Sequence, residues 1–140
     1  MAKIEQFEDL ECWKKARQLV NKVFEISKNE PLKKDFVLLD QFRRAALSVM
    51  NNIAEGFERY HSKEFVRFLD YSQSSAVEVQ SMLYVLVDNQ FISEAQFDDL
   101  YQCTEETKKI TRGLIRYLSQ KNGYNSYLKE SDIYYSLDAR

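Results

Sequence analysis

Apolar residues recur every three or four positions along most of this chain, which is the spacing of one face of an α-helix. In the first such stretch the pattern runs through Trp13, Ala16, Val20 and Val23. The chain has only three glycines and one proline in 140 residues, which is too few for the many turns of a sandwich or barrel. The sequence therefore predicts an all-α protein.

Four helical segments joined by short connections account for most of the chain. We expect them at residues 8–28, 34–57, 63–90 and 94–120. Short links between neighbours predict an up-down-up-down antiparallel four-helix bundle, as one domain over residues 1–120. Residues 121–140 form a tyrosine-rich C-terminal tail, which is too apolar for a solvated segment and which we expect to pack on its own bundle or on a neighbour's.

Several residues match the signals that begin or end a helix. They are Asn29-Glu30-Pro31 as a break, Gly56 as a left-handed cap, Ser62 as an N-cap, and Ser93 with Gln96 as a capping box. Within the third segment, Ser72 and Ser75 lie in the middle of the apolar pattern. Their small side chains would let a partner helix approach closely.

The charge is nearly balanced, with a net charge of −2, so the surface has no global field that would attract a polyanion. Binding of nucleic acid would need a local patch or several subunits. The uncharged stretches are short and contain polar residues, which argues against a membrane span and a membrane partner. No secretory signal follows Met1, so we expect a cytoplasmic protein.

Residues suited to catalysis or metal binding are scarce. His61 is the single histidine, and Cys12 and Cys103 lie far apart, so a zinc site is nearly excluded. Both cysteines fall on apolar faces, where a reduced core residue is favoured over a reactive thiol. No glycine-rich phosphate loop occurs. We therefore expect no enzyme, no metal and no cofactor.

Basic residues cluster along the last segment: Lys108, Lys109, Arg112 and Arg116. Lys108, Arg112 and Arg116 follow at steps of four and share one helix face. One interpretation is a stripe that contacts nucleic-acid phosphates. The other is complementarity to the helix dipole, because the same segment begins with Glu94, Asp98 and Asp99. Arg43 and Arg44 form a second candidate for nucleic-acid contact, with solvated or intersubunit pairing as the alternative.

A second apolar strip accompanies the core face of the third segment. Val66, Val77 and Tyr84 lie about 100–120° from Phe65 on a helical wheel. Two interpretations remain open. The strip is either part of a wide core that the tail covers, or a subunit interface of a homo-oligomer.

Longer motifs resemble a known family. They are FEDLECWKKA at residues 7–16, QFRRAALSV at 41–49, NIAEG at 52–56, Arg59, and SKEF at 62–65. In order and spacing they resemble the 23S rRNA intervening-sequence protein family, over about residues 7–119. One departure is Met50, where many members have proline, so a kink of the second segment is not expected here.

The resemblance implies a cytoplasmic bacterial four-helix bundle, with homopentameric rings known in the family. Genes of the family were noticed inside intervening sequences of 23S rRNA genes. A related protein, the accessory variability protein of diversity-generating retroelements, binds nucleic acid and a reverse transcriptase. The implied partners are therefore further copies of this chain, arranged as a pentamer, together with RNA or a nucleic-acid enzyme.

The family motif also places four polar residues along the second segment: Arg44, Asn52, Glu55 and Arg59. Their types suit a polar network, in which Glu55 pairs with Arg59 at i,i+4 and Asn52 with Glu55 at i,i+3. Two function classes follow from the whole sequence. One is an oligomeric adaptor or scaffold that binds RNA or a nucleic-acid enzyme, and the other is a structural or protein-interaction oligomer with no nucleic-acid role.

Overall fold

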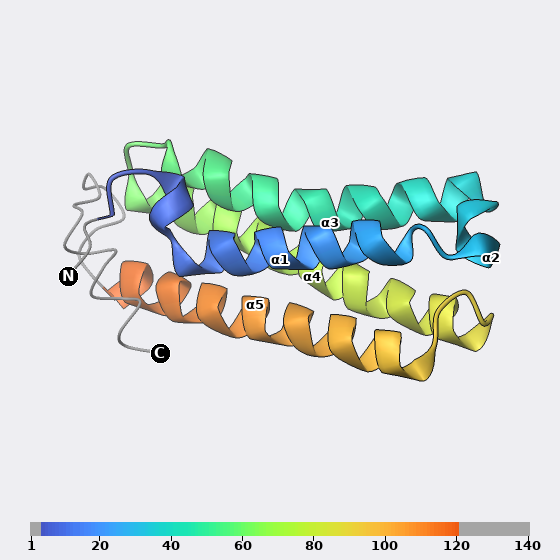
Figure 1. Cartoon of the computed structure of the whole chain (residues 1–140). Helices are drawn as coiled ribbons and strands as arrows, with labels where there is room; N and C mark the ends of the chain where they lie inside the picture. The colour runs from blue at the N-terminus through green and yellow to red at the C-terminus, as the bar shows by residue number, and fades with distance from the viewer. Residues whose placement is uncertain (1–3, 121–140) are drawn as a thin grey trace.

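Four long α-helices lie side by side in the computed structural model, which describes residues 4–120 (Figure 1). They are α1 (Glu11–Ile26), α3 (Phe36–Phe57), α4 (Ser62–Asp88) and α5 (Glu94–Gln120). A short 3-10 helix, η1 (Phe7–Asp9), precedes α1, and a one-turn helix, α2 (Glu30–Lys33), lies between α1 and α3. The predicted all-α bundle is confirmed. The predicted tail, residues 121–140, lies outside the described residues.

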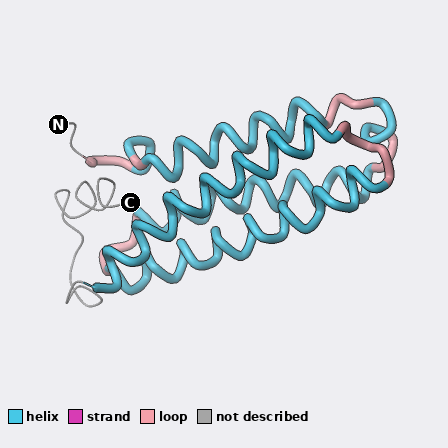
Figure 2. Tube along the Cα trace, turned by 90° about the horizontal axis from the view of Figure 1, so that it is seen from below, coloured by secondary structure: helices cyan, strands magenta, loops and turns pink. Residues whose placement is uncertain are grey.

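The order of the helices around the bundle is α1, α3, α4, α5, so that α3 lies diagonally opposite α5. The links from α1 to α3 and from α4 to α5 lie at one end of the bundle, and the link from α3 to α4 lies at the other (Figure 2). Successive long helices therefore run in opposite directions, as the short connections predict.

All four long helices contribute large side chains to one core. Leu19 of α1, Phe42 and Ile53 of α3, Leu83 of α4 and Leu114 of α5 are each at most 1% exposed. Burying a side chain of this size contributes roughly 1.5–3 kcal/mol to the free energy of unfolding. The helices are amphipathic, and packing of these faces supplies most of their stability.

The start of the first helix differs from the prediction. Leu10 has extended backbone angles and is fully buried, so it separates η1 from α1. The carboxylate of Asp9 accepts hydrogen bonds from the backbone N–H groups of Glu5 and Gln6, at 3.0 and 3.3 Å. These bonds hold the chain in a tight turn ahead of Leu10. A continuous helix from residue 8 is therefore wrong, because it would rotate Leu10 away from the core.

The predicted break at Asn29-Glu30-Pro31 is confirmed. Pro31 lies in the first turn of α2, where its missing N–H leaves no hydrogen bond unmade. Leu32, the next residue, is fully buried and anchors this turn to the core.

The capping residues at the link between α3 and α4 are not the predicted ones. Gly56 has no positive φ and lies inside α3, and Glu58 takes the C-cap position. Ser62 is the first residue of α4 and is buried, while His61 takes the N-cap position. Gly56 instead lies at the contact with α4, where a larger side chain would not fit.

The capping box at the start of α5 is confirmed. The Gln96 backbone N–H donates to Ser93 Oγ at 3.1 Å, and the Ser93 backbone N–H donates to Gln96 Oε1 at 3.0 Å. Two N–H groups at the start of the helix are thereby satisfied.

Small and hydroxylated side chains bring α3 and α4 close together, as the sequence predicts for Ser72 and Ser75. Ser72 Oγ donates a hydrogen bond to the backbone carbonyl of Val49 at 2.7 Å. The hydroxyl oxygens of Ser48 and Ser75 lie 2.7 Å apart. A hydroxyl that reaches the backbone of the neighbouring helix requires a short distance between the helix axes.

Gly56 marks the tightest point of that contact. A Cβ atom at this position would lie 2.7 Å from Phe68 Cβ and 2.9 Å from Phe65 Cδ1. Both distances are shorter than the contacts that Cβ atoms make in real structures, so only glycine fits here without displacing α4.

Candidate nucleic-acid interface

The basic residues of α5 do not share one environment. Lys109, Arg112 and Arg116 are exposed, whereas the side chain of Lys108 is only 16% exposed. Lys108 Nζ donates to Gln80 Oε1 of α4 at 2.9 Å and lies 3.4 Å from Glu105 Oε1. Lys108 therefore joins α4 to α5. The prediction that it belongs to the exposed basic stripe is wrong.

Glu105 completes this link between the two helices. Its Oε1 accepts a hydrogen bond from Gln80 Nε2 at 2.9 Å. That bond lowers the pKa of the Glu105 carboxyl, and the nearby charge of Lys108 lowers it further. The link is a charged, hydrogen-bonded bridge on the outside of the α4–α5 contact.

Most other basic side chains of the described residues have a partner within the chain. Lys14, Lys15, Lys22, Lys28, Lys33, Arg44, Arg67 and Lys108 pair with carboxylates, and Arg17, Arg43 and Arg59 lie over aromatic rings. Within residues 4–120, the basic side chains with neither kind of contact are Lys34, Lys63, Lys109, Arg112 and Arg116. Three of these five follow one another along α5.

The second predicted basic candidate is not part of this set. Arg43 is half-buried, with its guanidinium 4.9 Å from the centre of the Phe24 ring and its Nε donating to Ser27 Oγ at 3.3 Å. Arg44 Nε donates to Asp40 Oδ2 at 2.8 Å. Both are on α3, diagonally across the bundle from α5, so the structure does not bring them to the exposed residues of α5.

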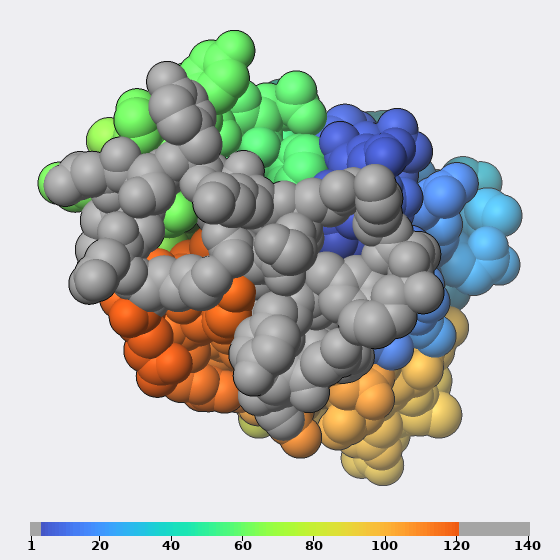
Figure 3. Space-filling model, turned by 90° about the vertical axis from the view of Figure 1, so that its left-hand side faces the viewer, coloured from blue at the N-terminus to red at the C-terminus, as the bar shows by residue number. Residues whose placement is uncertain are grey.

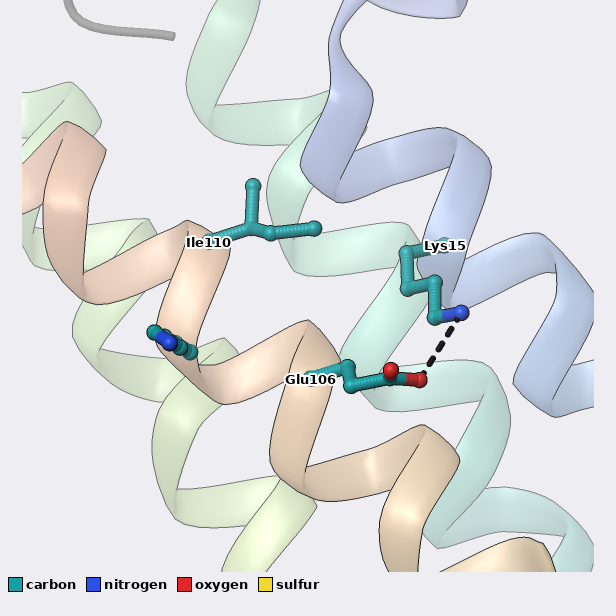
Figure 4. A pocket seen from close by; sticks show the side chains of 4 residues that line it. Lys15, Glu106 and Ile110 are labelled. Atoms are coloured by element: carbon teal, nitrogen blue, oxygen red, sulfur yellow. Dashed lines mark ion pairs between the residues drawn. The ribbon is translucent and has the colours of Figure 1, made fainter. Parts of the chain in front are cut away.

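One acidic residue of α5 is turned away from the basic set. Glu106 pairs with Lys15 of α1 at 3.0 Å, as the close view of this surface depression shows (Figure 4). Lys109 and Ile110 also line the depression. Because Glu106 forms its ion pair with Lys15, it forms none with Lys109, which lies on the same helix as Glu106.

The predicted apolar strip of α4 is only partly exposed. Val66 is 8% exposed and belongs to the core, so its inclusion in the strip is wrong. Val77 and Tyr84 are each about half exposed, at 52% and 51%. Gln73, close to them on the helix, donates to the backbone carbonyl of Lys108 in α5. The remaining strip therefore borders the α4–α5 contact.

Tyr84 belongs to an aromatic cluster that sequence reasoning missed. Its ring centre lies 5.0 Å from that of Phe97 and 6.1 Å from that of Tyr101, both on α5. Phe97 and Tyr101 stack at 5.5 Å with an interplanar angle of 25°. Tyr101 also raises the pKa of the Tyr84 hydroxyl. The i,i+4 spacing of Phe97 and Tyr101 was the available signal, but only the fold places Tyr84 against them.

The most exposed large apolar side chains are elsewhere and were also missed. Among the described residues, Phe36 is 79% and Val37 80% exposed, in the first turn of α3. Two adjacent residues of a helix point in different directions, so their spacing does not fit a single apolar face. Periodicity therefore gave no signal for them.

The polar network predicted from the family motif does not form. Arg59 lies beyond the end of α3, where its guanidinium is 4.6 Å from the centre of the Phe68 ring of α4. Because the helix ends at Phe57, the i,i+4 geometry that would join Glu55 to Arg59 is lost. Asn52 Nδ2 donates to the carbonyl and the hydroxyl of Ser48, one turn earlier, at 2.9 Å each.

The two cysteines are buried and unpaired. Burial raises the pKa of the Cys12 thiol to about 12, so it is not ionised near neutral pH. Residues 4–120 contain no group of three or more His, Cys, Asp or Glu side chains arranged to hold a metal ion. In the same range no helix has the length and apolar character needed to cross a membrane.

The basic end of α5 lies beside the start of α4. In the end-on view of the molecule, the orange surface of α5 and the green surface around the α3–α4 link both reach the outside (Figure 3). α4 and α5 are in contact with each other, and the cluster of Tyr84, Phe97 and Tyr101 lies farther along these two helices.

Comparisons with known proteins place this fold in a family. The chain is similar over residues 8–113 to the family described as 23S rRNA-intervening sequence protein. A solved structure from Bacteroides thetaiotaomicron, a protein with unknown function from the S23 ribosomal protein family, is 21% identical with a TM-score of 0.69. The similarity covers 75% of this chain and 98% of that one, and shows a shared fold.

No curated protein matches the chain. The family match, in contrast, spans most of the bundle and includes the motifs that suggest the resemblance. This chain therefore belongs to the 23S rRNA-intervening sequence protein family.

Proposed function

We propose that this protein is a non-enzymatic, cytoplasmic scaffold that binds RNA through Lys109, Arg112 and Arg116. The observation that supports the proposal is that these three exposed cations have no ion pair within 4.0 Å and no aromatic ring contact among residues 4–120; Arg112 acts on Glu105 only at longer range, where its charge helps to lower the pKa of that carboxyl. Exposed cations that are not neutralised within the chain remain available to a polyanion.

The spacing of the two arginines suits a nucleic-acid backbone. Arg112 and Arg116 are one helical turn apart, about 6 Å along the axis, which is close to the distance between successive phosphates. The net charge of −2 gives no general attraction for RNA, so binding would depend on these local contacts.

Self-association would multiply such a small basic set. A homo-oligomer, with five copies as the resemblance implies, repeats Lys109, Arg112 and Arg116 around one assembly and raises avidity without new contacts. The exposed Phe36 and Val37 support a subunit contact at the start of α3, because large apolar side chains are seldom left in water.

The salt dependence of RNA binding tests the proposal. We expect the unmodified protein to bind a fluorescent, structured RNA with a dissociation constant that rises steeply between about 50 and 200 mM salt, linearly on logarithmic axes. Fluorescence anisotropy measures both the affinity and the slope. Absence of binding at the lower salt concentration, or an affinity that salt does not change, would contradict an RNA-binding role.

A second candidate function is a structural oligomer with no nucleic-acid role, held together through the α4 face. The half-exposed side chains of Val77 and Tyr84 favour it. This candidate needs no explanation for the basic set beyond complementarity to the helix dipole.

Light scattering of two variants separates the candidates. We expect an assembly several times heavier than the 16.6 kDa monomer, which Val37→Glu dissociates and Val77→Glu leaves intact, because an unpaired charge is costly only inside an interface. Circular dichroism shows whether each variant stays helical. Dissociation by Val77→Glu instead of Val37→Glu supports the structural oligomer, and a monomeric unmodified protein contradicts both.

A further inference from the structure

We infer that the face shared by α4 and α5 takes a single-stranded segment of RNA, with bases stacked on the exposed ring of Tyr84 and phosphates held by Arg112 and Arg116. This inference rests on the proposed function and specifies the form of RNA. It joins two features that lie on the same pair of helices: the aromatic cluster, and the cations that have no close ion pair or ring contact among residues 4–120.

The aromatic cluster offers a stacking surface. Tyr84 is 51% exposed, while its own ring is supported by Phe97 and Tyr101 at 5.0 and 6.1 Å between centres. Both supporting rings are half-buried, so the cluster is fixed in place before any ligand arrives. A base that stacks on a supported ring gains contact without the entropic cost of ordering a mobile side chain.

The charge pattern along α5 continues from this cluster. From Tyr101 the helix passes the bridge of Lys108 and Glu105 and then reaches Arg112 and Arg116. The distance from Tyr101 to Arg116 is roughly 22 Å at 1.5 Å per residue. An extended strand of roughly four nucleotides spans it, which is a small site by the standard of single-strand-binding proteins.

The bridge keeps the middle of this path from being repulsive. Glu105 would oppose a phosphate if its charge were uncompensated, but its Oε1 accepts from Gln80 at 2.9 Å and lies 3.4 Å from Lys108 Nζ. Val77 is exposed on the α4 side of the same stretch and offers an apolar contact for a base or sugar. The face thus carries apolar and cationic groups on either side of a carboxylate that Lys108 and Gln80 compensate.

Single strands fit this arrangement better than a duplex. Stacking on a side chain needs an open base face, and in a duplex the neighbouring base pairs cover every base face except those at the ends. Phosphate contacts alone would favour the duplex, because its two backbones give it a higher charge density than a single strand has. The aromatic cluster is therefore the feature that selects the strand.

Three RNA probes of about 12 nucleotides test the inference: an unpaired sequence, its duplex, and an abasic strand of the same length. We expect the unpaired strand to bind the unmodified protein at least about fivefold more tightly than the other two, as stacking of a single base provides. Tyr84→Leu should abolish this preference and leave the slope of affinity against salt unchanged. Tyr84→Phe, which keeps the ring, should retain the preference.

The outcomes separate this inference from the proposed function. Equal affinity for the unpaired and abasic strands, with a steep dependence on salt, overturns stacking and leaves phosphate binding in place. Failure of all three probes to bind overturns both. A fall in molar mass on Tyr84→Leu, measured by light scattering, overturns the inference because the face would then be a subunit contact.

Discussion

Reversing both arginine charges, Arg112→Glu with Arg116→Glu, should weaken binding of every RNA sequence by at least about tenfold and flatten the dependence on salt. Loss of two phosphate contacts on a single strand lowers the slope by roughly 0.7 for each contact. Sequence preference should not change, because contacts to the backbone carry no base information. Anisotropy titrations over several salt concentrations measure both quantities.

A matched control has the same net charge. Lys33→Glu with Lys34→Glu also reverses two exposed cations, at the link between α1 and α3. This link lies at the opposite end of the bundle from the basic end of α5, so RNA affinity should fall much less. Equal losses in the two double variants would mean that net charge, and not the α5 surface, governs binding.

Complementarity to the helix dipole makes a different prediction for the same arginine variant. Under this interpretation the variant should have a lower melting temperature and an unchanged RNA affinity, because acidic side chains near the C-terminal end of a helix oppose its dipole. Measuring the melting temperature and the affinity on one preparation decides between the two interpretations. Unchanged affinity beside a lower melting temperature would end the RNA interpretation of this surface.

Gly56→Ala should lower the free energy of unfolding by about 1–3 kcal/mol, the usual cost of overpacking a close contact. The added Cβ would lie 2.7 Å from Phe68 Cβ and 3.3 Å from the backbone carbonyl oxygen of Phe65. Neither atom can rotate away, so α4 itself has to move. Alanine returns about 1 kcal/mol in a helix interior, which offsets part of this cost, so we expect a net loss at the lower end of that range. Urea denaturation followed by circular dichroism measures the change.

Glu55→Ala is the neighbouring control. Glu55 is exposed and has no ion pair among the described residues, so its replacement should change stability by no more than about 0.5 kcal/mol. If Gly56→Ala proved as stable as the unmodified protein, α3 and α4 would not be held at the distance described here.

Periodicity predicts the helices of this protein well because nearly all of the helix faces are used in one core. Buried residues such as Phe42 and Leu114 recur at helical spacing within their own segments, so the helices can be predicted without knowing which segments contact each other. Periodicity did not predict the extended conformation of Leu10, because a single apolar residue fits a helical repeat as well as an extended turn. What decides its conformation is the burial of its side chain, together with the bonds made by Asp9.

The candidate site was less predictable because it depends on partners from other helices. Lys108 and Lys109 are adjacent and chemically alike, yet one bridges to Gln80 and the other is exposed. Likewise Gly56 reads as a helix end in the sequence, while in the fold it is the point of closest approach to Phe68. Residue type and spacing carry no information about which neighbour a side chain meets.

The ion pair between Lys15 and Glu106 links folding to the charge of this surface. In an isolated helix Glu106 is an i,i+3 neighbour of Lys109 and would pair with it. In the bundle it reaches across to Lys15 instead, at 3.0 Å. That Lys109 has no ion pair among the described residues is therefore a property of the assembled bundle and not of α5 alone. By thermodynamic linkage, any polyanion that senses this charge stabilises the folded chain by an amount that grows with its concentration.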